Sequence, residues 1–292
     1  MNIQLSVIIV TYKKPELVKA CLDSIYKFND IGKKLEIIVS DNSPDDSIKR
    51  ICNREYKEVI YLRNGNIGFG AGNNVGVKIS RAPYLLFLNP DTILIEPVFK
   101  FALEKFENGS LMFGVQLVNK NGEKNTSFAY IDCYTIKKAL LGKLFNKIGV
   151  FLTGKMAIIG ADIFVRKDVF IESGMFDENI FMYAEESDLT KRIQKTFPDC
   201  EVSFYKEKSI IHLEGGVTKT EIKDTTEFVI SRMRTYKYYC YKWEIPLRDV
   251  VRFLRRRYMI MAIASRIKGN LESYDTYFSI SRAYKKEYEK IK

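Results

Sequence analysis

The feature that most restricts the fold of this chain is an alternation of short apolar runs with amphipathic segments over its first ninety residues. Four runs are apolar almost without interruption, as expected for strands that are buried on both faces. They cover residues 5–10, 35–39, 59–62 and 84–88. After the first run Pro15 can open a helix, in which Leu17, Cys21, Ile25 and Phe28 follow three or four residues apart. This order predicts an α/β fold with a mostly parallel, doubly wound sheet and helices on both faces.

Polar residues stand directly after three of these runs. They are Thr11 and Tyr12 after the first, Asp41 and Asn42 after the second, and Asn89-Pro90-Asp91 after the fourth. In open sheets of this kind, ligands bind at the carboxyl ends of the strands. The sequence therefore predicts a binding site that draws on all three clusters.

The rest of the chain divides into a weaker α/β pattern and a helical tail. Between residues 100 and 155 the only predicted element is a strand near 111–118. A regular apolar pattern appears again at 157–166 and in a helix that begins near Glu185. Strands near 202–205 and 209–213 are expected to complete this part of the chain. We expect an α/β domain over residues 1–219 and a basic, tyrosine-rich helical region over residues 220–292.

The net charge of +11 is concentrated in this tail. Residues 222–292 contain 17 Lys and Arg against 8 Asp and Glu, so they carry +9. Such a tail favours a polyanionic surface, either membrane lipid or nucleic acid. No nucleic-acid-binding motif is present, and the charge lies away from the polar strand ends, so we expect no nucleic-acid partner.

Residues 249–268 mix cations with apolar side chains, as in a helix that lies on a membrane. The cations are Arg252, Arg255, Arg256 and Arg257, and the apolar residues are Phe253, Met259, Ile260 and Ile263. The arginines can face anionic lipid while the apolar residues insert or pack. The alternative is a helix that packs on the rest of the chain or on a second copy in a homo-oligomer.

Cysteine usage and the absence of targeting segments indicate the compartment. The five cysteines are scattered, odd in number and without metal-ligand spacing, which indicates reduced thiols. The N-terminus has no basic leader or cleavage site, and no apolar stretch approaches the roughly 18 to 20 residues of a transmembrane helix. We expect a cytoplasmic protein, free or held peripherally at the inner face of the cytoplasmic membrane.

The densest local feature is residues 66–76, in which four glycines and three asparagines stand between a strand and a predicted helix. Glycines let a backbone approach a ligand closely, and amides at the start of a helix suit phosphate or sugar oxygens. The alternative is a glycine-rich connection without a ligand. The segment matches neither a P-loop nor the G-x-G-x-x-G pattern in its usual place, so those nucleotide motifs are disfavoured.

Acidic residues and the only histidine mark further candidate positions. Asp91 can coordinate a divalent cation that also binds diphosphate oxygens, or its tripeptide can be a plain strand-ending turn. Glu185, Glu186 and Asp188 can supply a general base and its orienting partners, or simply favour the positive end of a helix. His212 is either structural or, at a strand end, a metal ligand or phosphate contact.

Taken together and in this order, these segments resemble family 2 glycosyltransferases with the GT-A fold, and more narrowly their bacterial rhamnosyltransferase-like branch. The resemblance covers roughly residues 4–216. It is carried by residues 6–12, 41–43, 66–76, 89–91, 174–178 and 181–189. Each segment is short, but five or more in register are hard to produce by accident.

The resemblance implies a role for each candidate residue. The nucleotide-sugar-binding residues would be Thr11, Tyr12, Asp41, Asn42, Gly68, Gly70, Asn73 and Asn89. Asp91 would bind a divalent metal, Mn²⁺ or Mg²⁺, with His212 near the diphosphate as a further ligand. Glu186 would be the catalytic base, while Glu185 and Asp188 would orient the site or contact the acceptor.

Three positions depart from the family's pattern. Asn89 stands where many relatives carry the first aspartate of the D-x-D metal motif, and Glu186 stands where the base is usually an aspartate. Asp162 follows Gly160-Ala161, where an apolar residue is usual.

The activity implied by the resemblance is inverting, metal-dependent sugar transfer. The donor would be dTDP-rhamnose or a UDP-hexose, and the acceptor a saccharide or lipid-linked saccharide in bacterial surface polysaccharide synthesis. The alternative is a catalytically inactive protein that binds sugar nucleotides.

Overall fold

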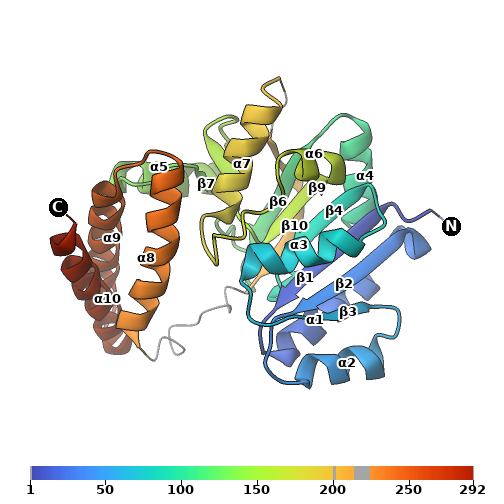
Figure 1. The fold of residues 1–292 in the computed structure, drawn as a ribbon, viewed down its shortest axis with the longest axis horizontal. Helices are drawn as coiled ribbons and strands as arrows, with labels where there is room; N and C mark the ends of the chain where they lie inside the picture. Colours follow the sequence, from blue (N-terminus) through green and yellow to red (C-terminus); the bar gives the residue numbers. More distant parts are fainter. Residues whose placement is uncertain (1, 200–201, 214–223, 292) are drawn as a thin grey trace. The chain divides into compact units, whose positions relative to one another are not determined.

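The structure, a computed structural model, describes residues 2–199, 202–213 and 224–291 (Figure 1). These residues divide into two compact units. The first contains 2–131, 142–181, 185–199 and 202–213, and the second contains 132–141, 182–184 and 224–291. The domain boundary predicted between residues 219 and 220 lies outside the described residues. So does the end of the segment that resembles the family, residues 214–216.

The first unit is built on a mixed, mostly parallel sheet. Its strands are β1 (Leu5–Thr11), β2 (Leu35–Asp41), β3 (Ile60–Arg63), β4 (Tyr84–Leu88), β5 (Thr92–Leu94), β6 (Met112–Val118), β9 (Asp162–Arg166) and β10 (Val202–His212). Within the described residues their order is β3-β2-β1-β4-β9-β6-β10-β5. β1 pairs in parallel with β2 and β4, β2 with β3, and β6 with β10. β9 and β5 run antiparallel to their neighbours. The predicted α/β fold with a mostly parallel sheet is confirmed.

Alternate residues of the central strands enter two hydrophobic cores. In β1, Leu5, Val7 and Ile9 join one cluster of buried residues, while Ile8 joins the other. The apolar residues of β4 divide in the same way. Because successive side chains of a strand point to opposite faces, a continuous apolar run is what a sheet covered on both faces requires.

Helices supply the other half of each core (Figure 1). One cluster takes side chains from α1 (Pro15–Lys27), α2 (Ser47–Glu55) and α4 (Phe99–Glu107). The other takes them from α3 (Phe69–Ile79), α6 (Lys167–Glu172) and α7 (Glu185–Thr196). A single 3-10 turn, η1 (Gly32–Lys34), leads into β2. The helix predicted after Pro15 is α1, with proline in its first turn as expected.

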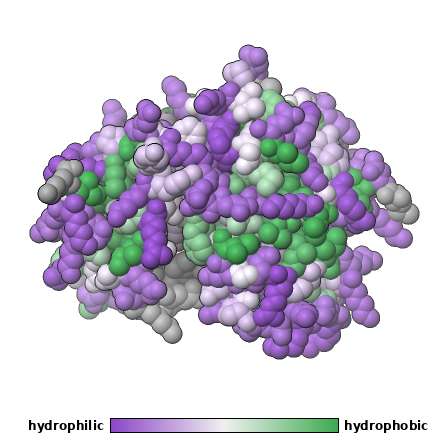
Figure 2. Space-filling model, viewed as in Figure 1, coloured by the Kyte–Doolittle hydropathy of each residue, from purple (hydrophilic) through white to green (hydrophobic). Residues whose placement is uncertain are grey.

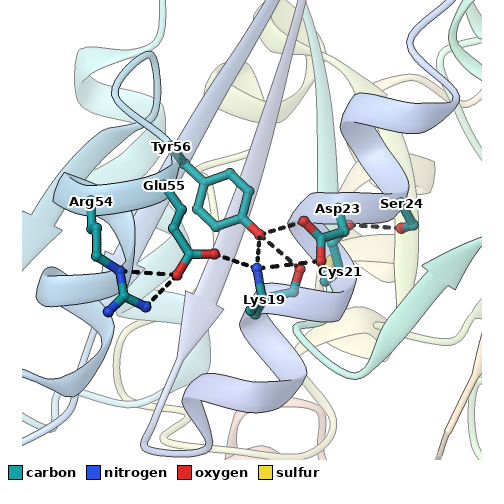
Figure 3. A network of polar contacts seen from close by, with 7 residues as sticks. All are labelled: Lys19, Cys21, Asp23, Ser24, Arg54, Glu55 and Tyr56. Atoms are coloured by element: carbon teal, nitrogen blue, oxygen red, sulfur yellow. Dashed lines mark hydrogen bonds and ion pairs between the residues drawn. The ribbon is translucent and has the colours of Figure 1, made fainter.

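A polar network joins α1 to the end of α2 (Figure 3). Lys19 of α1 forms an ion pair with Glu55 of α2, which also pairs with Arg54. The hydroxyl of Tyr56 donates to Asp23 Oδ1 at 2.6 Å, and burial together with this bond raises the pKa of Tyr56 to about 12. The ion pairs of this network lie at the surface, where each contributes little, so they add modestly to helix packing.

The structure differs from the prediction in two segments. Residues 100–155, where only one strand was predicted, also contain most of α4 together with β7 (Phe128–Tyr130) and α5 (Ile136–Ile148), and β8 (Met156–Ile158) follows to pair with β7. The two strands expected at 202–205 and 209–213 are one strand, β10, whose register against β6 shifts between Tyr205 and Ser209. The polar residues at this irregularity interrupt the apolar pattern, which explains the predicted break.

The second unit is helical, as the tail pattern predicted. Its helices after residue 223 are α8 (Thr225–Lys242), α9 (Leu247–Ile267) and α10 (Leu271–Lys290). They share a hydrophobic core, against which Tyr134 and Ile136 also pack. Of the apolar residues considered for membrane insertion, Phe253 is buried in this core at 5% exposure, so it packs. Ile260 and Ile263 are about half exposed.

Hydrophilic residues cover most of the face in Figure 2, and hydrophobic residues appear there in separate groups. Among the described residues, no helix is both long and apolar enough to cross a membrane. The cysteines of the described part, Cys21, Cys52, Cys133 and Cys240, are free thiols.

Candidate active site

The polar residues that follow β1 and β2 meet at the carboxyl edge of the sheet. Thr11 and Asp41 occupy the last paired position of the two strands, and the Asn42 N–H donates to the Thr11 carbonyl at 2.8 Å. Thr11, Asp41 and Asn42 are buried, whereas Tyr12 is 47% exposed. The structure therefore brings these four predicted nucleotide-binding residues together, with Tyr12 offering an accessible aromatic face.

The Asp41 carboxylate is fixed by two donors. The Ser43 N–H donates to Oδ1 at 2.9 Å, and the Tyr61 hydroxyl donates to Oδ2 at 2.7 Å. Burial together with this bond raises the pKa of the Tyr61 hydroxyl, which stays protonated and can donate. A carboxylate group has about four acceptor positions, so two donors leave part of the capacity of Asp41 unused, and its predicted contact with the nucleotide stays a prediction.

Asn64 belongs to the same edge and was not predicted. Its Nδ2 donates to Ser40 Oγ at 2.8 Å and to Asn42 Oδ1 at 3.1 Å. Asn64 directly follows β3, the third strand of the parallel set. The strand-end rule that selects Asp41 and Asn42 selects Asn64 as well, so the signal was present in the sequence.

Two glycines of the 66–76 segment pack against a loop from much later in the chain. Gly68 has φ 94°, and a Cβ there would lie 2.5 Å from the carbonyl oxygen of Phe181. A Cβ on Gly70 would lie 2.9 Å from Cβ of Phe176. These contacts account for glycine at both positions without a ligand. The predicted part of Gly68 and Gly70 in donor binding stays a prediction.

The two buried asparagines of α3 differ in how their amides are used. Asn74 exchanges two hydrogen bonds with the backbone of Phe176, donating at 2.8 Å and accepting at 3.1 Å. Asn73 donates to the Phe69 carbonyl at 3.1 Å, while its Oδ1 is buried without a hydrogen-bond partner among the described residues. An unpaired buried acceptor costs about 1–3 kcal/mol. Asn73 Oδ1 is therefore suited to accept from a ligand hydroxyl, in keeping with its predicted place in the donor pocket.

Asp91 and His212 come together although they lie far apart in the sequence. Asp91 directly precedes β5, in which Thr92 pairs with His212 at the end of β10. Asp91 Oδ1 lies 3.4 Å from His212 Nε2, and Asp91 is 4% exposed. The structure describes no group of three or more His, Cys, Asp or Glu side chains that could hold a metal ion together. One carboxylate and one imidazole fit a cation that takes its remaining ligands from a diphosphate.

Asn89, in contrast, contributes its backbone. Its N–H donates to the Ala161 carbonyl at 3.0 Å, and its carbonyl accepts from the Thr92 hydroxyl at 2.7 Å. The bond to Ala161 continues the pairing of β4 with β9, and the bond from Thr92 closes the turn between β4 and β5. Its predicted contact with the donor stays a prediction.

The three carboxylates at the start of α7 have different surroundings. Glu185 is buried at 7% exposure and Asp188 is buried completely. Asp188 accepts from Arg192 Nε at 2.8 Å, and Arg192 also donates to the Ser173 carbonyl. Glu186 is only half-buried. The orienting role expected for Asp188 suits this ion pair, and Glu186 is the carboxylate of the three that a substrate can reach most easily.

Asp162, the unusual residue after Gly160-Ala161, has a structural explanation. It lies in β9 where the pairing of β9 with β6 ends, and its Oδ2 accepts from the Val115 N–H at 2.7 Å. Its carboxyl group thereby replaces the backbone acceptor that β9 no longer offers. Asp162 is fully buried, and this burial raises the pKa of its carboxyl group well above the usual range.

Comparison with known proteins identifies this arrangement. The family model of glycosyl transferase family 2 matches residues 6–170, more than half of the chain. The chain belongs to glycosyl transferase family 2. It is therefore a glycosyltransferase, an enzyme that takes a nucleotide-sugar donor and a saccharide acceptor.

Relatives of this glycosyltransferase are distant. It is 25% identical over 203 residues to rhamnosyltransferase WbbL of Escherichia coli K12, covering 64% of this chain and 75% of that protein. It is 26% identical over 207 residues to the low-salt glycan biosynthesis hexosyltransferase Agl10 of Haloferax volcanii, covering 65% of this chain and 62% of that protein. The crystal structure of S. aureus TarS 1-349 matches with a TM-score of 0.53 at 13% identity, covering 97% and 92% of the two chains. The fold is GT-A.

Proposed function

We propose that this glycosyltransferase transfers rhamnose from dTDP-rhamnose, or a hexose from its UDP donor, with inversion at the anomeric carbon. The acceptor is a saccharide or lipid-linked saccharide of a bacterial surface polysaccharide. The observation that carries the proposal is the contrast at the start of α7, where Glu185 and Asp188 are buried and Glu186 is accessible. A general base must come within hydrogen-bond reach of the acceptor hydroxyl, and the exposure of Glu186 favours it over its two buried neighbours for that role.

In the proposed reaction Glu186 accepts the proton of the acceptor hydroxyl while the hydroxyl oxygen attacks the anomeric carbon. The bond from that carbon to the diphosphate oxygen breaks on the opposite face, and the electron pair leaves with the diphosphate. Asp91 and His212 would hold Mn²⁺ or Mg²⁺, which supplies positive charge beside the diphosphate when bound. Asp41 and Asn73 orient the donor through their unused acceptor capacity.

Similarity supports the choice of sugar. One relative is named a rhamnosyltransferase and another a hexosyltransferase, and these names support a rhamnose donor and a hexose donor, respectively. Rhamnose is favoured because the sequence motifs resemble the rhamnosyltransferase-like branch.

A lipid-linked acceptor would place the enzyme at the membrane surface, and α9 offers a suitable face. Ile260, Ile263 and Ile267 follow three or four residues apart and are 49%, 52% and 81% exposed. Arg256 and Arg257 are exposed one turn earlier. We propose that this face binds peripherally to anionic lipid.

The base assignment is tested with Glu186→Gln, measured for transfer and for nucleotide binding. Removing the base should lower kcat by about 10²–10⁴-fold. A Mn²⁺-dependent thermal shift with dTDP or UDP should survive in this variant but disappear in Asp91→Ala. Glu172→Gln makes the same charge change at an exposed position of α6 and should leave both readouts unchanged. Near-normal turnover of Glu186→Gln would contradict the assignment, and a Mn²⁺-dependent shift in Asp91→Ala would contradict the metal site.

A further inference from the structure

Two residues directly before α7 adopt a backbone conformation that their side chains disfavour. Tyr183 has φ 72° and Ala184 has φ 73°, and neither is glycine or asparagine. Left-handed backbone costs such residues about 1–2 kcal/mol each, so the surrounding structure must hold them there. The next two residues are Glu185 and Glu186, so this strained pair sets how the chain enters the helix that carries the proposed base.

The side chains that hold this segment come from α8, in the same compact unit as residues 182–184. The Arg232 guanidinium carbon lies 4.2 Å from the centroid of the Tyr183 ring, in cation–π stacking distance. Thr235 Oγ1 donates to the Met182 carbonyl at 3.1 Å. Arg232 and Thr235 are three residues apart and therefore share one face of the helix. Side chain and backbone of the segment are thus both fixed by one turn of α8.

Arg232 is itself held in place by hydroxyl groups. Its two terminal nitrogens donate to the hydroxyls of Tyr258 at 3.0 Å and Tyr236 at 2.9 Å. Its Nε is buried without a hydrogen-bond partner, and no carboxylate pairs with it among the described residues. Burying part of a guanidinium without a carboxylate is costly, and ion pairing does not explain this half-buried arginine. Its contacts with aromatic rings do: the Tyr183 ring is the nearest, and the rings of Phe228 and Tyr236 lie at 5.5 Å and 5.6 Å.

We infer that Arg232 and Thr235 are positioning residues for catalysis: they hold residues 182–184 in the left-handed conformation that aims Glu186 at the acceptor. The inference rests on the proposed function of Glu186. It gives the helical tail a part in the reaction, through its contacts with residues 182–184. A displacement of about 1 Å at a catalytic group can cost roughly 100-fold in rate, which sets the scale of the expected effect.

The test is steady-state kinetics of Arg232→Met, which keeps the length of the side chain and removes the planar charge. We expect kcat to fall by roughly 10- to 100-fold. KM for the donor and the nucleotide-dependent thermal shift should not change, because the donor residues lie on other elements. Arg234→Met removes the same charge from an exposed position of α8 and should leave kcat unchanged. If Arg232→Met does not fold, Thr235→Val removes only the bond to Met182 and should lower kcat in the same direction.

A rescue variant distinguishes a positioning role of Arg232 from an effect of Arg232 on the stability of the whole protein. Asparagine adopts left-handed backbone more readily than alanine, so Ala184→Asn should restore part of kcat in the Arg232→Met background. Normal kcat in the folded Arg232→Met variant would overturn the inference. So would a parallel loss of kcat and donor binding that Ala184→Asn does not repair. If Glu186→Gln is inactive and Arg232→Met is fully active, only this inference fails; if Glu186→Gln is active, the proposed function fails first.

Discussion

At the scale of single residues, Asp162 shows how one buried carboxyl group makes stability depend on pH. The group is fully buried, accepts one hydrogen bond from Val115, and has a raised pKa in the folded chain. In the unfolded chain its pKa returns to about 3.9. Between these two pKa values the folded state binds one proton more than the unfolded state. Folding is therefore favoured by this group at low pH and loses that contribution as pH rises.

We predict that Asp162→Asn becomes more stable relative to the wild type as pH rises, because the amide is neutral at every pH and still accepts from Val115. Between the two pKa values the difference should grow by up to about 1.4 kcal/mol per pH unit. Chemical denaturation of both proteins at about pH 5 and about pH 8 measures it. Unfolding free energies that run parallel between these two conditions would show that Asp162 is ionised in the folded protein.

The family resemblance assigned a role to each candidate site residue, but the residue types alone left those roles open. Glu185, Glu186 and Asp188 are all acidic and lie within four positions of each other. Their burial in the folded chain distinguishes them. His212 could be read as a structural residue or as a ligand until β10 placed it opposite Thr92 and beside Asp91. Burial and long-range pairing are tertiary properties, so neither distinction could be made from local sequence.

At the scale of elements, helix α3 packs unusually close to β1. A Cβ on Gly72 would lie 2.9 Å from Val10, and one on Gly76 would lie 2.6 Å from Ile8. Both distances are far below van der Waals contact. The glycines of this helix thus let α3 approach the strand that ends in the predicted nucleotide-binding residues, a role that accounts for part of the motif without any ligand.

Gly76→Ala should therefore destabilise the protein by about 1–3 kcal/mol, although alanine is the better helix former. In an Ile8→Ala background the clash is removed, and the same substitution should become neutral or stabilising. Thermal unfolding of the four proteins in this cycle gives the coupling. Gly65→Ala, where no atom lies within 4 Å of the added Cβ, is the control. Equal costs of Gly76→Ala in both backgrounds would rule out the close approach as the reason for glycine.

Element prediction succeeded where the apolar pattern was continuous, as in β1, β2 and β4. It failed in residues 100–155, where short elements such as β7 have few residues in which a period can show. It also split β10 into two strands, because the chain leaves register there and polar residues interrupt the run. Pairing partners hold such a strand together, and a local pattern does not contain them.

At the scale of the whole molecule, the chain combines a GT-A unit with a basic helical unit that includes residues 132–141 and 182–184. Both segments come from the middle of the sequence. A division into consecutive domains cannot describe this, since residues join a unit through packing and not through their order in the chain.

The membrane proposal is also tested at this scale, by flotation of the full chain with vesicles. We predict binding to vesicles that contain anionic lipid, weakened by salt, and its loss when Ile260, Ile263 and Ile267 are all changed to serine. The control changes Ile79, Ile95 and Ile171 to serine, three exposed isoleucines on separate parts of the GT-A unit. Equal flotation of the two triple variants would exclude the α9 face as the contact.

The sequence by itself determined the α/β class, the parallel strands with their polar ends, and the family, because these rest on short periodic patterns and ordered motifs. The tertiary structure decided which carboxylate is accessible, that Asp91 meets His212, and that α8 holds the segment before Glu185. Each of these depends on the distance between residues far apart in the chain. Such distances follow from the packing of the whole sheet and its helices, and no local stretch of sequence records them.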